Sequence, residues 1–200
     1  MTETKTVEPR AESRATTIRR WVVLVGLIVA LVGGATMVYL VGSHNRAADR
    51  RAVLRYEASV LAQVREMSVV AGSLSDVADA FQKGTLSADA LFKSATEWQM
   101  TFTRVDRSLE AIPIPIVFGE GEPMFAPAAR EYARAAGLYA AFAACSRNSV
   151  GPSASCIATA TASAAAGHAL ALYRHAATVV QDTRTRLGLG RSPNFGDPPR

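Results

Sequence analysis

An uninterrupted apolar segment at residues 21–42, WVVLVGLIVALVGGATMVYLVG, limits what this chain can fold into more than any other feature. It carries no charge and follows directly on Arg19 and Arg20. At about 1.5 Å per residue, a helix of this length would extend roughly 33 Å, enough for a hydrocarbon core of about 30 Å. Trp21 and Tyr39 lie near its two ends, where amphipathic rings favour the headgroup region. The sequence therefore predicts one transmembrane helix here.

A cleaved signal peptide is the main alternative to a retained signal-anchor. The small residues Gly33, Gly34 and Ala35 would suit a cleavage site. The apolar run continues beyond them through residues 37–41. This continuation favours retention of the segment as an anchor.

The flanking arginines alone do not orient the segment. They are equally numerous on both sides, so the positive-inside count is a tie between Arg10, Arg14, Arg19 and Arg20 before it and Arg46, Arg50, Arg51 and Arg55 after it. Two facts favour a cytoplasmic N-terminus: the pair at 19–20 abuts the segment, and the two cysteines suit an oxidising compartment for the rest of the chain. We expect a bacterial plasma-membrane protein with a disordered cytoplasmic tail at residues 1–20 and an extracytoplasmic C-terminal domain.

Gly26, Ala30 and Gly34 recur every four residues and so share one face of the predicted membrane helix. Small residues at this spacing let two membrane helices approach closely. The pattern predicts a homodimer contact in the membrane. The simpler interpretation is that glycine and alanine are common in membrane helices.

The composition limits the remainder to one ordinary domain. Of 200 residues, about 150 follow the anchor, which is enough for one compact core. The net charge is +5, and the basic residues are dispersed rather than clustered, which argues against a nucleic-acid partner.

Two segments carry apolar residues in strict four-three spacing, which predicts two helices with coiled-coil-like packing. The first stripe, widened by Leu54 and Leu61, is Val60, Val64, Met67, Ala71, Leu74, Ala78 and Phe81; the second is Leu91, Ala95, Trp98, Phe102, Val105, Leu109 and Ile112. Gly84 is a suitable stop for the first helix and Ser87 a suitable cap for the second. The short connection between them implies an antiparallel pair.

Two further helices complete the predicted domain. The third begins near Pro123 or Pro127 and carries the stripe Phe125, Ala128, Tyr132, Ala135, Tyr139 and Phe142. The fourth begins after Pro152, with the stripe Cys156, Ala160, Ala166, Leu170, Tyr173, Ala177 and Val180. We therefore expect an all-α protein: an N-terminal transmembrane helix, an antiparallel four-helix bundle over 43–188 and a flexible tail at 189–200.

A second membrane span at residues 148–173 is the alternative topology, because this stretch has no formal charge. Serine, threonine and His168 lie within it, and alanine contributes little insertion energy. The bundle is therefore the preferred assignment for this stretch.

Cys145 and Cys156 are the two cysteines of the chain, and they bracket the predicted turn between the third and fourth helices. A disulfide there would close a short loop and would stabilise the hairpin by on the order of 2–3 kcal/mol. Two unpaired buried thiols are the alternative. The spacing does not fit a CxxC redox motif or a zinc site.

No catalytic, cofactor or metal site is predicted. His168 and His175 are too far apart along one helix to share an ion without a third element, and no Glu-x-x-His motif occurs. The motifs of serine hydrolases, zinc proteases and nucleotide-binding enzymes are not present in the sequence. Five aromatic residues either line a small-ligand pocket or serve as ordinary core: Trp98, Phe102, Tyr132, Tyr139 and Phe142.

The proline-rich connection IPIPIVFGEGEP carries apolar residues expected at the surface: Ile114, Ile116, Val117 and Phe118. Exposed contiguous apolar surface often marks an interface. The first functional hypothesis is therefore a non-enzymatic envelope protein whose bundle binds an unidentified protein partner as an accessory or scaffold module.

The second hypothesis is an extracytoplasmic small-ligand sensor. A membrane span followed by a helical bundle resembles the periplasmic sensor of bacterial chemoreceptors in architecture only, and no motif is shared. A structural spacer that dimerises through the membrane helix is a third reading.

Overall fold

The computed structural model describes residues 12–119, 121–148 and 159–195, with side chains for 44–119, 121–147 and 159–195. The chain divides into two units, Met1–Ala48 and Asp49–Arg200. In the first unit the described residues are helical. In the second, the described residues form a helical bundle.

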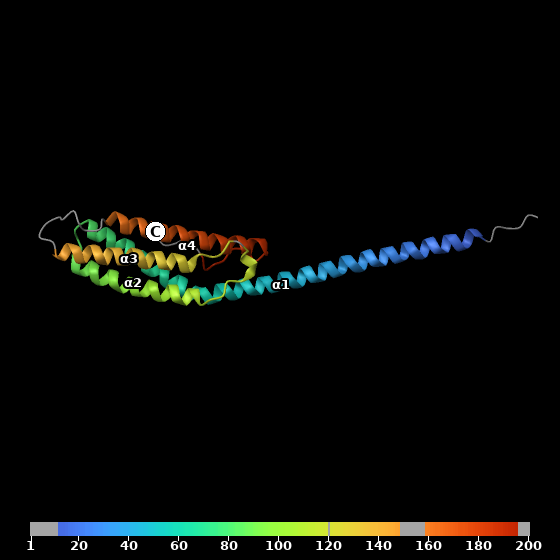
Figure 1. The fold of residues 1–200 in the computed structure, drawn as a ribbon, viewed down its shortest axis with the longest axis horizontal. Helices are drawn as coiled ribbons and strands as arrows, with labels where there is room; N and C mark the ends of the chain where they lie inside the picture. The colour runs from blue at the N-terminus through green and yellow to red at the C-terminus, as the bar shows by residue number, and fades with distance from the viewer. Residues whose placement is uncertain (1–11, 120, 149–158, 196–200) are drawn as a thin grey trace, which may run out of the picture. The chain divides into compact units, whose positions relative to one another are not determined.

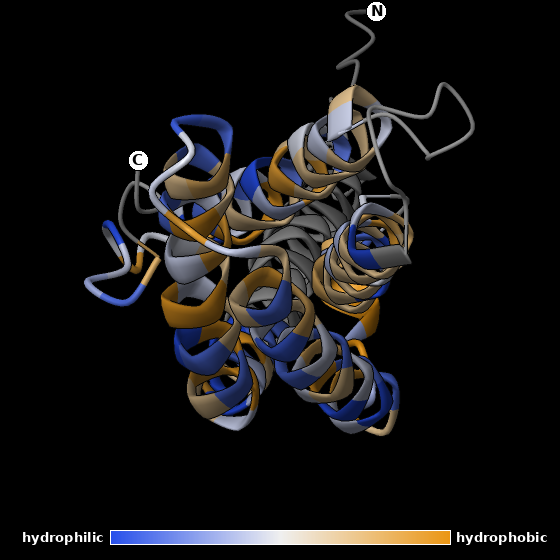
Figure 2. Ribbon diagram, turned by 90° about the vertical axis from the view of Figure 1, so that its left-hand side faces the viewer, coloured by the Kyte–Doolittle hydropathy of each residue, from blue (hydrophilic) through white to orange (hydrophobic). Residues whose placement is uncertain are grey.

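The elements of the chain are all helices in the described ranges: α1 (Glu12–Gln82), α2 (Ala88–Glu110), a 3-10 turn η1 (Ile116–Phe118), α3 (Phe125–Asn148) and α4 (Thr159–Arg186) (Figure 1). This confirms the all-α prediction. Seen nearly end-on, the helices of the bundle each carry both hydrophilic and hydrophobic segments (Figure 2). Such amphipathic helices bury their apolar stripes against one another.

Neighbouring helices of the bundle run in opposite directions, because the start of each contacts the end of the next. Four contacts between helices show this: Asp106–Arg130, Asp89–Arg147, Tyr139–Ser163 and Glu57–Arg184. The described part of the Asp49–Arg200 unit is thus an antiparallel four-helix bundle, as the short connections predict.

The predicted stripes of α2 and α3 are confirmed, and that of α1 needs one correction. Most of their members are buried and the others pack partly buried against the core. Leu54 was expected to widen the α1 stripe, but it is 44% exposed; Val53 and Tyr56 are buried instead. The heptad phase of α1 continues backward through Glu57 to Val53, which leaves Leu54 on the outer side.

The predicted stripe of α4 is partly wrong. Ala160 is exposed, and the buried face is Ala162, Ala165, Ala169, Tyr173, Ala176 and Val180. Residues 159–166, at the start of α4, are all alanine, serine or threonine, so hydrophobic contrast there is too low to set the helical phase. Tyr173 and Val180 were placed correctly because they do provide contrast.

The junction between α1 and α2 forms as the sequence predicts. Gly84 adopts φ +70°, and the amide of Thr85 donates to the carbonyl of Ala80 at 3.0 Å. Glycine reaches this left-handed conformation without a Cβ penalty, which ends α1. The Ser87 side chain then accepts from the amide of Ala90 at 3.2 Å and caps α2.

The chain after α4 differs from the flexible tail expected at 189–200, since residues 189–195 pack on the bundle. Phe195 is buried and stacks on Phe125, with ring centroids 5.3 Å apart. The Arg184 guanidinium donates to the carbonyls of Leu189 and Gly190, each at 3.0 Å. Gly188 and Gly190 adopt φ +68° and +69°, which glycine reaches without a Cβ penalty. Residues 196–200 lie outside the described part.

Among residues whose side chains are described, no helix is both long and apolar enough to cross a membrane. The predicted span at 21–42 falls in the part of α1 whose side chains are not described, so it stays a prediction, as does the dimer face Gly26, Ala30 and Gly34. The described portion of the alternative second span, 159–173, is the first half of α4, and its alanine face lies in the bundle core.

Candidate functional site

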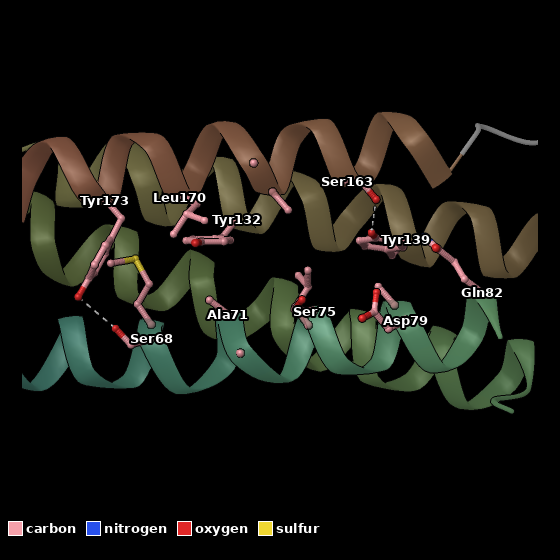
Figure 3. Close-up of a pocket in the computed structure, with 16 residues that line it drawn as sticks. Ser68, Ala71, Ser75, Asp79, Gln82, Tyr132, Tyr139, Ser163, Leu170 and Tyr173 are labelled. Atoms are coloured by element: carbon pink, nitrogen blue, oxygen red, sulfur yellow. Dashed lines mark hydrogen bonds between the residues drawn. The ribbon is translucent and has the colours of Figure 1, made fainter. Parts of the chain in front are cut away.

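A groove lies between α1 and α4 in the described bundle, with α3 behind it (Figure 3). Its volume is about 250 Å³. It is lined by Met67, Ser68, Ala71, Gly72, Leu74, Ser75, Ala78, Asp79 and Gln82 of α1, Tyr132 and Tyr139 of α3, and Ser163, Ala166, Gly167, Leu170 and Tyr173 of α4.

Short side chains on the two facing helices create this space. Ala71, Gly72 and Ser75 line it from α1, and Ala166 and Gly167 from α4. A Cβ added at the last of these would meet no heavy atom within 4 Å. Longer side chains at these positions would fill the gap, as they do in a close-packed bundle core.

Two of the three tyrosines in the groove are held by serine hydroxyls from the opposite helix. Tyr139 Oη lies 2.8 Å from Ser163 Oγ, and Tyr173 Oη lies 3.4 Å from Ser68 Oγ (Figure 3). These contacts fix the aromatic rings along the groove. They also give the hydroxyl groups of these two tyrosines a hydrogen-bond partner each.

Tyr132 lies between these two pairs, beside Leu170 (Figure 3). Its hydroxyl makes no hydrogen bond to protein in the described part of the chain. Burial, reinforced by Tyr173, raises the pKa of Tyr132 to about 12, while Arg174 acts in the opposite direction. The phenol therefore stays neutral at physiological pH and can donate a hydrogen bond to a bound molecule.

The polarity of the groove changes along its length. Asp79, Gln82 and the Tyr139–Ser163 pair gather at one end, whereas Tyr132 and Leu170 lie in an apolar stretch farther along (Figure 3). Asp79 provides the one formal charge in the lining, and its side chain forms no ion pair among the described residues. The groove therefore has an anionic end and an apolar, aromatic stretch.

The five aromatic residues singled out in the sequence separate into two groups. Tyr132 and Tyr139 line the groove. Phe102 is buried behind Tyr132, with stacked rings 5.1 Å apart, and Trp98 and Phe142 pack partly buried against the core.

Sequence reasoning missed the contribution of the two other helices to the groove: Ser68, Ala71, Ser75 and Asp79 of α1 and Ser163, Gly167 and Tyr173 of α4. One signal could have indicated the groove. Small residues occur on both α1 and α4, and these two helices are neighbours in an antiparallel bundle. Between these small residues the structure leaves a groove.

Of the apolar connection that was expected to lie at the surface, only part is exposed. Ile116 is 97% exposed and Ile114 is 41% exposed. Val117 is partly buried, and Phe118 is 5% exposed with its ring 5.2 Å from that of Tyr56. The candidate partner-binding surface thus reduces to the two isoleucines, because the 3-10 turn η1 rotates Phe118 into the core.

The remaining candidates contribute no second site. His168 and His175 are exposed, the former 3.8 Å from Glu131. No group of three potential metal ligands occurs among the described residues. Cys145 lies in the last turns of α3, while Cys156 lies outside the described residues, so their pairing stays a prediction.

The chain matches no protein-family model, no curated protein and no solved structure. Its proposed function therefore rests on its own residues.

Proposed function

We propose that this chain is a single-pass membrane protein whose extracytoplasmic bundle binds a small ligand in the groove between α1 and α4. The groove is the observation that carries the proposal. Its volume of about 250 Å³ exceeds the roughly 150 Å³ of an engineered cavity that binds benzene. An apolar lining with a few convergent polar groups is typical of ligand sites.

The membrane anchor in this proposal is the apolar segment at residues 21–42, with the N-terminus in the bacterial cytoplasm. Its charge-free length supports a span. The small face Gly26, Ala30 and Gly34 would join two copies in the membrane. Replacing Gly34 with leucine should then abolish self-association of the segment in a membrane two-hybrid assay, and unchanged association would remove the dimer.

The extracytoplasmic placement of the bundle rests on a disulfide between Cys145 and Cys156. No free cysteine occurs among the described residues. The expected bridge would join the end of α3 to the segment before α4. Mass spectrometry of protein alkylated without reductant should find no modified cysteine; two modified thiols would refute the bridge and weaken the orientation.

Gly167 offers a direct test of the groove. A leucine there should occupy the groove, and it should not weaken α4, because leucine favours helices more than glycine does by up to about 1 kcal/mol. Ala171→Leu is the matched control, since Ala171 is exposed on the same helix and does not line the groove.

The probes are three small aromatic compounds of different charge: phenethylamine, 2-phenylethanol and 3-phenylpropanoate. Calorimetric titration would use the full chain in nonionic micelles, with Gly167→Leu protein in the same micelles as the blank for partitioning. At least one probe should bind the wild type and Ala171→Leu but not Gly167→Leu. Equal heats for all three proteins with every probe would refute a binding groove.

A second candidate function is protein binding through Ile114 and Ile116. The nearly complete exposure of Ile116 favours this function, because burial of a large exposed apolar side chain in an interface lowers the free energy. The Ile114→Ser/Ile116→Ser variant should lose a partner that co-purifies with the wild type. Val69→Ser, at a 71% exposed position on α1, is the control and should retain that partner. Retention by both variants would refute this surface.

A further inference from the structure

The electrostatic character of the groove narrows the class of ligand. Asp79 is the one charged residue among the sixteen that line it, and no lysine, arginine or histidine is among them. An anionic ligand would therefore lose its hydration without meeting a counter-charge, which is costly. A cationic ligand would meet a carboxylate that no described side chain neutralises.

The charged groups nearest the groove do not reverse this polarity. Arg174 lies close enough to Tyr132 to influence its pKa, so it acts at the apolar stretch rather than at the Asp79 end. Asp76, which lies three residues before Asp79 on α1, is exposed and outside the lining. Lys83, four residues after Asp79, is exposed, lies outside the lining and forms no salt bridge with Asp79, so Asp79 supplies the charge in the lining at this end of the groove.

The aromatic lining favours the same class of ligand. The faces of tyrosine rings attract ammonium groups through their negative quadrupole. Tyr139 and Asp79 both line the polar end of the groove (Figure 3). A carboxylate beside an aromatic ring suits a positively charged head group better than a neutral one.

The other end of the groove supplies an apolar surface for the rest of such a molecule. Tyr132, Leu170 and Ala71 lie about two helical turns away from the Asp79 end of the groove (Figure 3). A head group at Asp79 would thus leave an attached apolar body against these three residues.

We infer that the groove takes a small amphipathic organic cation, with its amine or quaternary ammonium head at Asp79 and Tyr139 and its apolar body along Tyr132, Leu170 and Ala71. This inference rests on the proposed ligand-binding function and adds the chemical class of the ligand.

The same three probes test the inference, because phenethylamine and 2-phenylethanol are similar in size and differ in charge at neutral pH. Phenethylamine should bind the wild type about tenfold more tightly than 2-phenylethanol at low ionic strength. The preference should shrink as salt is added, because Asp79 is exposed and its field is screened. 3-Phenylpropanoate should bind most weakly.

Asp79→Asn provides the decisive comparison, and Asp76→Asn is its matched control on the same helix. Asp79→Asn should bring the two affinities within about twofold of each other by removing the charge, whereas Asp76→Asn should keep the wild-type preference. Three results would each overturn the inference while leaving a binding groove intact. They are near-equal affinities of phenethylamine and 2-phenylethanol for the wild type, tightest binding of 3-phenylpropanoate, and a preference for phenethylamine that survives Asp79→Asn. Failure of every probe to bind in a manner sensitive to Gly167→Leu would overturn the proposed function as well.

Discussion

Arg184 Nη1 lies 2.5 Å from Glu57 Oε2, and both side chains are less than a tenth exposed. The contact joins the last turn of α4 to α1 over 127 positions in the sequence. Burial raises the pKa of the Glu57 carboxyl, and the guanidinium of Arg184 opposes this rise. The same guanidinium donates to carbonyls of the chain after α4, so one arginine holds both α1 and the C-terminal segment.

Removing one partner of this ion pair should be strongly destabilising, because the other charge is then buried without compensation. Glu57→Leu is expected to lower the free energy of unfolding by about 3–5 kcal/mol. Glu57→Leu/Arg184→Met should recover part of the loss. Urea unfolding of the full chain in nonionic micelles, followed by circular dichroism, measures both effects.

The exposed pair Glu66–Arg104 is the control, since it also joins α1 to another helix. Glu66→Leu should change the free energy of unfolding by less than about 1 kcal/mol, because water and salt screen such pairs. Similar losses for Glu57→Leu and Glu66→Leu would show that burial does not govern the strength of these contacts.

Two buried phenols should make the bundle sensitive to alkaline pH. Burial, assisted by Glu122, raises the pKa of Tyr56 to about 12, and burial with Tyr173 raises that of Tyr132 to about 12. The ordinary pKa of a tyrosine is about 10, so the folded state retains these protons more strongly than the unfolded state does. Their contribution to stability is complete below pH 10 and is lost towards pH 12, on the order of 2 kcal/mol for each phenol.

Phenolate absorbance during a pH titration of the folded protein checks this prediction. Tyr132→Phe should remove one phenol from the group that ionises near pH 12. An unchanged amplitude in that range would mean that Tyr132 ionises earlier and is not shielded.

Substitution by alanine should have opposite effects on stability at Gly167 and at Gly84. A Cβ at either position meets nothing within 4 Å, but Gly84 has φ +70° whereas Gly167 lies inside α4. Gly167→Ala should stabilise the protein by about 0.5–1 kcal/mol through helix propensity. Gly84→Ala should destabilise it by about 1–2 kcal/mol, because L-residues are strained in the left-handed region. Urea midpoints that move in the same direction would contradict this account.

Phe118 and Ile116 should respond very differently to truncation although they are two residues apart. Phe118→Ala should cost about 3–5 kcal/mol, since its ring is buried against Tyr56. Ile116→Ala should change stability by less than about 0.5 kcal/mol, because its side chain is almost fully exposed. Comparable losses in thermal or urea unfolding would place both residues in the core. The contrast also explains why a test of partner binding should leave Phe118 intact.

The helices of the bundle were predictable where apolar and polar residues contrast. The stripes from Val60 in α1 and Leu91 in α2 repeat so regularly that one helical phase fits them. In the first half of α4 the phase was wrong, because Ala160 and Ala162 are identical in hydropathy, so the sequence does not show which of them faces the core. The packed segment up to Phe195 was also missed, since its order depends on Phe125, an aromatic residue far away in the sequence on which Phe195 stacks.

The groove was predictable only in part, because a cavity depends on what three helices place opposite one another. Tyr132 and Tyr139 stood out as aromatic residues on one stripe. Tyr173 was predicted as a member of the α4 stripe, but the sequence did not show that it lines a groove. Asp79 gave no signal, since a single aspartate on an exposed helix position is ordinary until the groove beside it is known.

Tyrosine-selective isotope labelling and nuclear magnetic resonance test the central claim most directly. The ring signals of Tyr132, Tyr139 and Tyr56 would be assigned with phenylalanine variants and followed while phenethylamine is added to the full chain in nonionic micelles. The account predicts saturable shifts at Tyr132 and Tyr139 and no shift at Tyr56, which lies outside the groove against Phe118. Equal shifts at all three, or none at any of them, would contradict a ligand site between α1 and α4.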